Sequence, residues 1–395
     1  EFHKLRPEVP IWVGGPEVSY EIERMFVENP SFYGVVIGEG EATFLELCAY
    51  YCNGKKGSLS DIAGIAYRDG EKYDERQEGS PAITRTKPRA PIDLSSIPFC
   101  YEDMTDFENR IIYYESSSYC LSSIDKKLRF RNTELVKKEL QFFIDKKVPQ
   151  VKFVDRTFNC NHTHAMEIWK FIQEKDIGIT NFHFEIAADL LTEEETALLS
   201  TFRPGLVQLE IGVQSTNLQT IEEIHRKMQL SDVESSVRFI QTAGNIHEHL
   251  DLIAGLPYEN YERFGQSFRD IYALKPNQLQ LGFLKVLKGS YIFEHKDEYD
   301  MIYRSKPPYE IMQTKWLSYD EVLLIKLVEE MLEVYYNSGQ FEITMKLIDV
   351  VYPDSFGFFL RLGQFYEDMG YLGMNHSRIR RCEILLEFLK QEKQV

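Results

Sequence analysis

The chain has 395 residues and a formal net charge of -17, with 43% hydrophobic and 27% charged residues. This length allows two or three domains, and the composition is that of an ordinary globular protein with a large core. Because sequence-independent nucleic-acid binding depends on Lys and Arg, the acidic balance excludes a broad polyanion-binding surface, and we expect no nucleic-acid partner. The chain has no apolar run near the ~20 residues of a membrane helix, no signal-peptide pattern and no disulfide framework among its six cysteines. We therefore expect a cytoplasmic protein with reduced thiols and no membrane partner.

Residues 1–57 alternate short apolar strands with helices, which is typical of a parallel sheet covered on both faces. The predicted strands "IWVGG" and "YGVVIGEGE" carry glycines at their ends, and a predicted helix follows each of them. The chain opens within a predicted helix and without Met, so we interpret its start as lying inside a domain.

Residues 58–105 form a different kind of segment. "IAGIAYRDGEK" predicts a hairpin that turns at Asp69 and Gly70. "SPAITRTKPRAPIDLSSIPF" is rich in Pro and Ser, which predicts a linker between two alternating regions.

Residues 106–300 contain six strand and helix units. The predicted strands are "RIIYYESS", "VPQVKFVDRTF", "NFHFEIAADL", "LVQLEIGVQS", "HEHLDLIAGLP" and "NQLQLGFLKVL". Amphipathic helices separate them, and Thr192 with Glu195 predicts a capping box at the start of one. The pattern predicts an α/β fold, a (β/α)6 partial TIM barrel, whose active site lies at the C-terminal ends of the strands. Residues 301–395 lose the strand pattern and predict a C-terminal helical domain.

Polar side chains recur at these strand ends. They are Cys120 after the first strand, Asp155 on the second, Glu185 on the third, Glu210 and Gln214 on the fourth, and Asp251 on the fifth. Several such residues converging on one mouth predict a ligand site. Glu185 lies among apolar neighbours, where an unpaired carboxylate is costly, so a ligand role is favoured over a structural ion pair. Arg226 alone is typical of a surface charge, and Cys120 alone of an inert core thiol.

"FEIAADLL", "LEIGVQS", "IHRKM" and "HLDLIAGLPYE", in this order, resemble the core of the radical S-adenosylmethionine (radical SAM) enzymes over residues 110–290. The resemblance implies that Glu185 contacts the ribose or amino group of S-adenosylmethionine (SAM). It also implies that Gln214, Arg226 and Asp251 hold the ribose and carboxylate, and an Arg can pair bidentately with such a carboxylate. "KFVDRTFN" resembles the second-strand stretch that passes the methionyl amine, which places Asp155 near the cofactor.

The family's hallmark is a Cys-x3-Cys-x2-Cys loop after the first strand, which binds three irons of a [4Fe-4S] cluster. In "ESSSYCLSS", Cys120 with Tyr119 before it matches the third cysteine, and the other two have no counterpart. The resemblance makes Cys120 the metal ligand and catalytic thiolate. Two explanations stay open: the protein lacks the cluster, or a short segment is missing from the sequence between Ser117 and Tyr119. We favour the second, because the flanks join as if a loop had been removed and the SAM set is kept.

"PIWVGGPEVS" and "GVVIGEGEATFLEL" resemble the second half of the Rossmann-like cobalamin-binding (B12) domain that precedes the radical SAM barrel in one large subfamily. In that subfamily the two turns approach the nucleotide tail of the cofactor through backbone, which requires residues without a Cβ. The resemblance assigns this role to Gly14, Gly15, Pro16, Gly38, Glu39, Gly40 and Glu41. Taken separately, each turn is also compatible with an ordinary strand end, and the axial ligand of cobalamin would lie before Glu1.

The resemblance implies an enzyme that cleaves SAM to a 5'-deoxyadenosyl radical and uses cobalamin to transfer a methyl group to an unactivated carbon. Its substrate would be a small molecule or peptide, and its electron donor a flavodoxin or ferredoxin. The alternatives are a rearrangement, cyclisation or methylthiotransferase-like enzyme, and, in another class, a module that binds SAM or cobalamin without a cluster. The substrate is not readable from the sequence.

Overall fold

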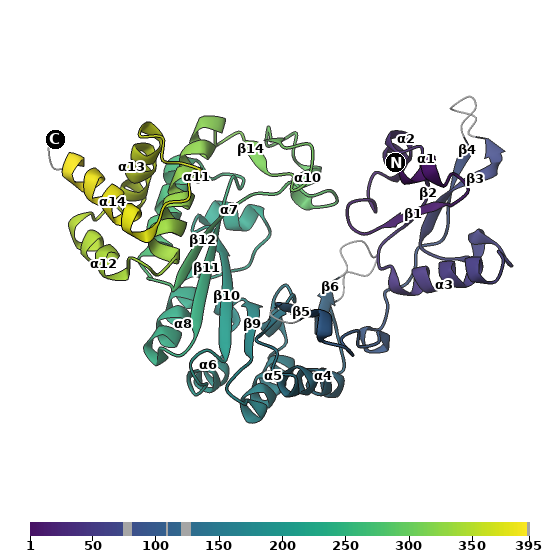
Figure 1. Cartoon of the computed structure of the whole chain (residues 1–395), viewed down its shortest axis with the longest axis horizontal. Helices are drawn as coiled ribbons and strands as arrows, with labels where there is room; N and C mark the ends of the chain where they lie inside the picture. The colour runs from purple at the N-terminus through teal and green to yellow at the C-terminus, as the bar shows by residue number, and fades with distance from the viewer. Residues whose placement is uncertain (74–80, 108–109, 120–127, 393–395) are drawn as a thin grey trace. The chain divides into compact units, whose positions relative to one another are not determined.

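The computed structural model describes residues 1–73, 81–107, 110–119 and 128–392 (Figure 1). The chain forms two compact units. Unit 1 comprises residues 1–104, 115–139 and 288–290, and unit 2 comprises residues 105–114, 140–287 and 291–395.

Unit 1 is built on a four-stranded sheet with the order β1-β2-β3-β4. Strands β1 and β2 are parallel, whereas β3 is antiparallel to both β2 and β4. A separate antiparallel pair joins β6 to β7. The elements are α1 (Phe2–Leu5), β1 (Ile11–Gly14), α2 (Ile22–Glu28), β2 (Phe32–Val36), α3 (Glu41–Cys52), β3 (Ile65–Tyr73), β4 (Pro81–Arg85), β6 (Ser117–Tyr119) and β7 (Leu128–Phe130).

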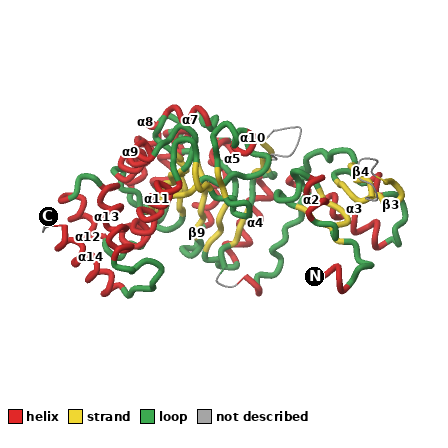
Figure 2. Tube along the Cα trace, turned by 90° about the horizontal axis from the view of Figure 1, so that it is seen from above, coloured by secondary structure: helices red, strands yellow, loops and turns green. Residues whose placement is uncertain are grey.

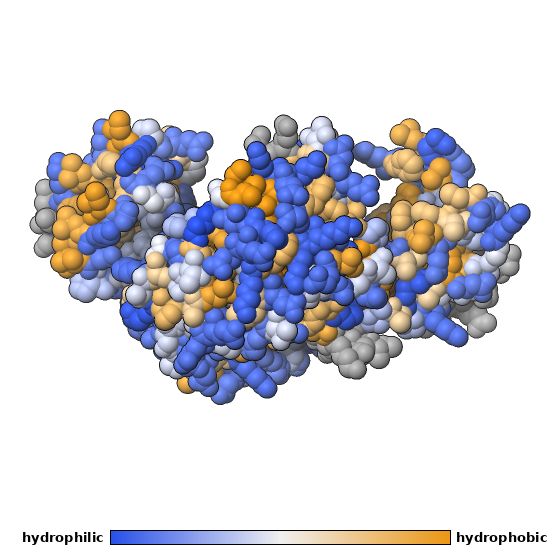
Figure 3. All heavy atoms as spheres, turned by 90° about the horizontal axis from the view of Figure 1, so that it is seen from below, coloured by the Kyte–Doolittle hydropathy of each residue, from blue (hydrophilic) through white to orange (hydrophobic). Residues whose placement is uncertain are grey.

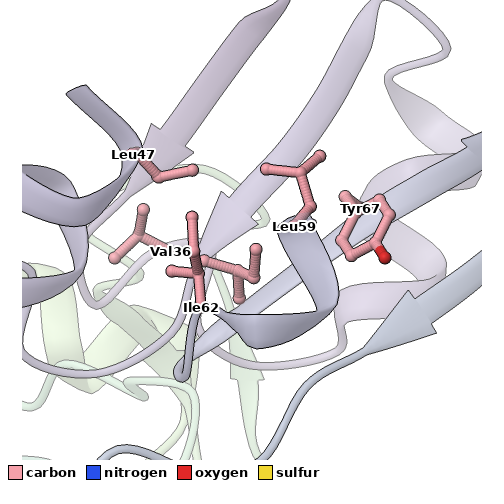
Figure 4. Packing of buried hydrophobic residues seen from close by; sticks show 6 residues of the cluster. Val36, Leu47, Leu59, Ile62 and Tyr67 are labelled. Atoms are coloured by element: carbon pink, nitrogen blue, oxygen red, sulfur yellow. The ribbon is translucent and has the colours of Figure 1, made fainter. Parts of the chain in front are cut away.

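Both faces of this sheet carry a core, because neighbouring residues of a strand point to opposite sides. On β2, Val36 packs with Leu47, Leu59, Ile62 and Tyr67 (Figure 4). The adjacent Val35 belongs to a second cluster, with Ile22, Met25, Phe26 and Ala66. The expected covering of both faces of the sheet is thus confirmed.

Two features of residues 58–105 differ from the prediction. Asp69 and Gly70 lie inside β3, and Asp69 is paired with Ala82 of β4, so the predicted turn at this dipeptide is wrong. Residues 81–85, which were predicted as part of a linker, form β4. The antiparallel pairing of the two strands does confirm the predicted hairpin, and the chain that connects them lies outside the described residues.

Unit 2 contains a sheet of six parallel strands in the order β12-β11-β10-β9-β8-β5, which is the order of the chain reversed. Helices alternate with the strands (Figures 1 and 2). This confirms the predicted (β/α)6 partial barrel. The strands are β5 (Ile112–Tyr114), β8 (Gln150–Phe153), β9 (Asn181–Ile186), β10 (Val207–Gln214), β11 (His247–Ala254) and β12 (Gln278–Phe283). The helices are α4 (Thr133–Asp145), of which residues 140–145 belong to unit 2, α5 (His162–Lys175), α6 (Glu193–Ser200), α7 (Leu218–Glu223), α8 (Leu230–Ala243) and α9 (Tyr261–Tyr272).

Local signals explain where some of these elements begin and end. The predicted capping box is present at the start of α6, where Thr192 and Glu195 bond to each other's backbone N–H. The first barrel strand is shorter than predicted: β5 ends at Tyr114, and Ser117–Tyr119 forms β6, which pairs with β7. Tyr119 therefore lies on a separate strand pair, and Cys120 lies outside the described residues.

The two faces of the barrel sheet differ in polarity. On β10 and β11, Leu209, Ile211, Leu250 and Leu252 are buried. Because side chains alternate along a strand, the residues between them, such as Glu210, belong to the opposite face. The apolar face is the one that a layer of amphipathic helices can cover, which leaves the polar face for a site.

The C-terminal residues belong to unit 2. Its elements are α10 (Tyr291–Glu294), β13 (Ile302–Tyr303), β14 (Ile311–Gln313), α11 (Tyr319–Leu332), a π-helical turn (Glu333–Asn337), α12 (Glu342–Val351), α13 (Ser355–Asp368) and α14 (Arg378–Glu392). The region is mainly helical, as predicted, but the antiparallel pair β13 and β14 was not expected.

The surface seen in Figure 3 is mostly polar, with scattered apolar patches. Within the described residues, no helix combines the length and the apolar character needed to cross a membrane.

Candidate functional site

Parallel pairing brings the predicted strand-end residues together on the polar face of the barrel sheet. Glu185 of β9 lies opposite Glu210 of β10. Glu210 in turn lies opposite His249 of β11, and Gly212 opposite Asp251. Because in-register neighbours of a parallel sheet are one strand spacing apart, these side chains form one polar cluster, which lies near the end of β9 and near the middle of β10 and β11.

Glu185 is a carboxylate of this cluster whose pKa is raised. Burial raises the pKa of Glu185 to about 7, and the negative charges of Glu210 and Asp251 add to this effect. Lys152 and Arg226 act in the opposite direction but do not offset it. Glu185 therefore changes its charge near neutral pH, and a cationic ligand would favour its ionised form.

Glu210 is held in the ionised state by two side chains. The pKa of Glu210 is lowered to about 2, first by His183 and then by Lys152. Lys152 Nζ donates to Glu210 Oε2 at 2.9 Å. His183 Nε2 lies 2.9 Å from the same oxygen but has no hydrogen bond aligned with it. Of the two contacts, only that of Lys152 has the geometry of a hydrogen bond.

Asp251 is half-buried, and its buried Oδ1 atom is an unused acceptor. Burial raises the pKa of Asp251, although the adjacent His249 opposes this shift. His249 Nε2 lies 3.0 Å from Asp251 Oδ1, yet neither atom has a hydrogen-bond partner among the described residues. A ligand with hydroxyl or ammonium donors would satisfy the carboxylate oxygen.

Gln214 and Arg226 meet around Gly212. Gln214 has a left-handed backbone (φ +72°) at the end of β10, where the register with β11 shifts. Its Oε1 atom is buried and has no hydrogen-bond partner within the described part of the chain. Arg226 is half-buried, and its Nη2 donates to the Gly212 carbonyl. The structure thus brings Gln214 and Arg226 to the same strand end.

The environment of Arg226 is acidic. Its guanidinium interacts with Asp189, Glu185 and Asp251, while burial lowers its pKa. It is not the solvated surface charge that an isolated Arg would suggest. An Arg close to unpaired acceptors offers complementary groups to a ligand that carries a carboxylate, an ammonium and hydroxyls, which are the polar groups of SAM.

Sequence reasoning did not single out Lys152, His183 and His249. The sequence could have pointed to the two histidines, because they precede Glu185 and Asp251 by two residues and must share a face of the sheet with them.

Asp155, which was predicted to lie near the cofactor, is buried in the loop after β8. It lies close enough to Cys160 to contribute to raising the pKa of that thiol, after burial itself.

Unit 1 has a cavity of about 470 Å³ where β1 and β2 end and α3 begins. It is lined by Trp12, Val13, Gly14, Gly15, Val36, Gly38, Gly40, Glu41 and Phe44. Five of the seven residues predicted to contact cobalamin are thus in the lining, and Pro16 and Glu39 are not.

The glycines of this cavity expose backbone. Gly15 and Gly38 have positive φ angles of 101° and 77°, which other residues rarely adopt. A Cβ on Gly15 would meet nothing within 4 Å, so the backbone angle and not crowding within the protein favours glycine there. At Gly15 and Gly38 the cavity is thus lined by backbone without a Cβ.

Glu39 is engaged elsewhere. Its carboxylate forms an ion pair with Arg129 and accepts a hydrogen bond from Ile92 N at 2.9 Å. Through these two side-chain contacts, Glu39 connects residue 92 and β7 to the end of β2.

The described cysteines do not form a metal site. Cys48, Cys52, Cys100, Cys160 and Cys382 are all unpaired thiols. The residues that the structure describes include no group of three or more His, Cys, Asp or Glu side chains placed to hold a metal ion. Cys120 is not among them, so the predicted cluster ligand lies outside the described residues.

Comparison with known families identifies two segments. Residues 98–271 match the model of the radical SAM superfamily, and residues 297–395 match a family described as "Protein of unknown function (DUF4080)". The chain therefore contains a radical SAM domain, as predicted, followed by a C-terminal region of a family without an assigned function.

Three known proteins are similar to this chain over most of its length. An uncharacterized methyltransferase of Pyrococcus horikoshii is 23% identical over 301 residues, which are 74% of this chain and 64% of the relative. The radical SAM methyltransferase TsrM of Kitasatospora setae, solved with cobalamin and a [4Fe-4S] cluster bound, has a TM-score of 0.59 at 15% identity. That match covers 79% of this chain and 64% of TsrM.

The third is the cobalamin-dependent SAM radical enzyme OxsB in its apo form, with a TM-score of 0.62 at 14% identity, covering 99% of this chain and 64% of OxsB. At these identities the structural likeness shows the fold. The chain spans 64% of the length of each of the three proteins.

Proposed function

Because residues 98–271 form a radical SAM domain, we propose that this chain is part of a cobalamin-dependent radical SAM methyltransferase. The substrate is a small molecule or peptide that receives a methyl group on an unactivated carbon. The observation that carries the proposal is the group of Glu185, Gln214 and Asp251 on three neighbouring strands, with Arg226 beside them, in a domain of this family.

The SAM site follows from the chemistry of these side chains. Arg226 pairs with the methionine carboxylate, because it is the cation at this strand end and can bind a carboxylate bidentately. Gln214 Oε1 and Asp251 Oδ1, both buried acceptors without a hydrogen bond among the described residues, accept from ribose hydroxyls. Glu185 accepts from the methionyl ammonium, which lowers the pKa of its carboxyl on binding.

The cobalamin site is the cavity at the ends of β1 and β2. Its four glycines present backbone and no side chains, and Phe44 and Trp12 supply apolar surface. A likeness in fold to TsrM and OxsB supports this site, since TsrM was solved with cobalamin bound and OxsB is a cobalamin-dependent enzyme.

The iron-sulfur site is the part of the proposal that the described residues do not test. Cys120 would be one ligand, and the encoded sequence between Ser117 and Tyr119 would supply the other two. When bound, the cluster supplies the electron that cleaves SAM to methionine and a 5'-deoxyadenosyl radical, and cobalamin supplies the methyl carrier. The chain's own residues bind and orient SAM.

The experiment uses the full-length protein, reconstituted anaerobically with iron and sulfide and reduced with dithionite. We expect absorbance near ~400 nm from thiolate-ligated iron and sulfide, and formation of methionine and 5'-deoxyadenosine from SAM. Cys120→Ser should lose both, whereas Cys382→Ser should keep both. A wild-type protein that shows neither signal would exclude the radical enzyme and favour the cluster-less binding module.

A second measurement separates methyl transfer from the other radical reactions. With SAM labelled in its methyl group, a methyltransferase moves the label to bound cobalamin in the absence of substrate. A rearrangement or cyclisation enzyme leaves all of the label in SAM and methionine. Failure of labelling, together with SAM cleavage, would remove methyl transfer from the proposal and retain the radical SAM activity.

A further inference from the structure

The segment that carries Arg226 is attached to the C-terminal part of the chain through a carboxylate. Helix α7 ends at Glu223, three residues before Arg226. Glu223 Oε1 accepts a hydrogen bond from Tyr291 Oη at 3.1 Å and a second, shorter one from Tyr299 Oη. The two tyrosine hydroxyls lie 3.4 Å apart. One carboxylate oxygen thus receives two donors from residues about 70 positions later in the chain.

Ring contacts add to the hydrogen bonds between the Arg226 segment and the C-terminal part of the chain. The His225 ring packs edge-on against Tyr291, with ring centroids 4.5 Å apart and an interplanar angle of 87°. His295 lies against both tyrosines, with centroid distances of 4.0 Å to Tyr291 and 6.0 Å to Tyr299. His225 has a left-handed backbone (φ +56°), so this short segment is held in a conformation that a free chain would seldom adopt.

Apolar packing fixes the remaining residue of the segment. Ile224 packs against a core cluster that contains Tyr299, Met301 and Ile311. All three belong to the C-terminal family region, residues 297–395. Tyr299 is only 1% exposed. Its ring packs in the cluster, and its hydroxyl donates to Glu223.

From these contacts, and resting on the proposed role of Arg226 in SAM binding, we infer that Glu223, Tyr291 and Tyr299 are positioning residues that hold Arg226 at the SAM site. The C-terminal region thereby becomes necessary for SAM binding. The three residues do not touch SAM. They act because residues 224–226 are joined by backbone hydrogen bonds to the last turn of α7, so the position of this turn decides where Arg226 meets the Gly212 carbonyl and the acidic groups of the barrel.

Tyr299→Phe removes the hydroxyl and keeps the ring, so it tests the hydrogen bond by itself. The matched control is Tyr272→Phe. Tyr272 is also buried and also donates to a carboxylate, Asp349 Oδ1 at 2.9 Å, but its ring stacks on Phe268 and not on residues 223–226. Both variants lose one buried hydrogen bond to a carboxylate, and they should lose similar thermal stability.

The measurement is equilibrium dialysis of SAM against full-length wild type and variants. We expect the dissociation constant of Tyr299→Phe to rise at least fivefold and that of Tyr272→Phe to stay within twofold of wild type. Glu223→Ala should behave like Tyr299→Phe or worse. Glu223→Gln should recover most of the affinity, because its amide oxygen still accepts from the tyrosines. Equal affinity in wild type, Tyr299→Phe and Glu223→Ala would overturn the inference, as would an equal loss in Tyr272→Phe.

Hydrogen exchange of the backbone amides of residues 224–229 gives a second readout that does not require SAM. Exchange should be faster in Tyr299→Phe than in wild type, and unchanged in Tyr272→Phe. If wild type fails to bind SAM, the proposed function is wrong. The exchange rates still decide whether the tyrosines hold this segment, and equal rates in the two variants would reject that.

Discussion

Gly212 leaves the space that the Gln214 side chain occupies: a Cβ on Gly212 would lie 2.4 Å from Gln214 Nε2 and 3.8 Å from Arg226 Nη2. No side chain larger than hydrogen fits without moving the Gln214 amide. Gly212 also lies opposite Asp251 on the next strand. The proposed SAM contact of Gln214 therefore depends on a position that bears no functional group, whereas the 3.8 Å distance to Arg226 is an ordinary contact.

We expect Gly212→Ala to weaken SAM binding by about tenfold, because displacing one well-placed hydrogen-bonding group costs roughly 1.4 kcal/mol. Stability should change little, since alanine is compatible with a strand. The measurement is the SAM dissociation constant together with a urea denaturation curve.

The control for this prediction is Gly282→Ala on β12. Its Cβ would meet Leu252 O at 3.5 Å and Ile253 Cγ1 at 3.7 Å, which are ordinary contacts. This variant should bind SAM as wild type does. If Gly212→Ala also binds SAM normally, Gln214 is not a SAM contact.

A second substitution tests Gln214 directly. Gln214→Asn withdraws the amide by one methylene, and Asn tolerates the left-handed backbone that this position requires. SAM affinity should fall several-fold. Gln208→Asn makes the same chemical change earlier on β10 and should leave affinity unchanged. Similar affinities in the two variants would contradict the assignment of Gln214.

The pH dependence of SAM binding should report Glu185. Burial raises the pKa of Glu185 to about 7, and the SAM ammonium favours the ionised carboxylate. Below pH 7 the carboxyl must release a proton to bind SAM, so affinity should rise with pH up to about 7, and it should fall again above pH ~8, where the amino group of SAM loses its own proton. The slope below pH 7 should approach tenfold per pH unit. Dialysis from pH 5.5 to 8.5 measures it.

The Glu185→Gln variant provides the comparison for this experiment. It should bind SAM more weakly at pH 8 and should lose the rise with pH, because the amide does not titrate. Glu210 does not produce this dependence, since its pKa is lowered to about 2. An unchanged pH profile in Glu185→Gln would show that another group titrates.

The parts of the site that could be predicted are those with a chemical signature at a strand end. Glu185 and Asp251 stand out because a carboxylate in an apolar strand is costly without a partner. Lys152 and His183 do not stand out, because their importance depends on which strands are neighbours in the sheet. Glu210 connects them only through the parallel register.

The same distinction applies to the fold. Long strands with regular alternation, such as β10 and β11, were predicted correctly. The turn predicted at Asp69 and Gly70 was wrong because cross-strand pairing with β4 outweighs the local turn preference. Strands β13 and β14 have two and three residues, too few for alternation to be recognised.

Lys152 should contribute to stability through Glu210. Their side chains are 31% and 18% exposed, so solvent screens the pair only in part. The lowered pKa of Glu210 means that this carboxylate adds stability above pH ~4.3, its unfolded pKa, and that the gain is lost as pH falls towards 2. At pH 7 we expect Lys152→Met to lower the free energy of unfolding by about 1–3 kcal/mol.

Lys170→Met is the control for this substitution. Lys170 pairs with Glu194 at 3.4 Å, and their side chains are 58% and 75% exposed. Exposed pairs contribute little, so the change should stay within ~0.5 kcal/mol. Urea denaturation at pH 7 measures both variants. Equal effects would mean that Glu210 is stabilised by His183 without help from Lys152.

Gly363 should set the distance between α11 and α13. A Cβ at this position would lie 2.7 Å from Leu327 Cβ and 3.0 Å from Leu327 O. Because backbone cannot move aside as a side chain can, Gly363→Ala should force the helices apart and destabilise unit 2 by roughly 1–3 kcal/mol. This outweighs the ~1 kcal/mol that alanine adds to an isolated helix.

Gly265→Ala in α9 offers the contrast. Its Cβ would approach Phe356 Cδ1 at 3.1 Å and Arg269 Nη1 at 3.2 Å, which are side-chain atoms that can shift. The loss of unfolding free energy should be smaller than for Gly363→Ala, and the gain in helix propensity should offset part of it. Urea denaturation of both variants gives the comparison. A Gly363→Ala protein more stable than wild type would show that α11 and α13 can separate without loss.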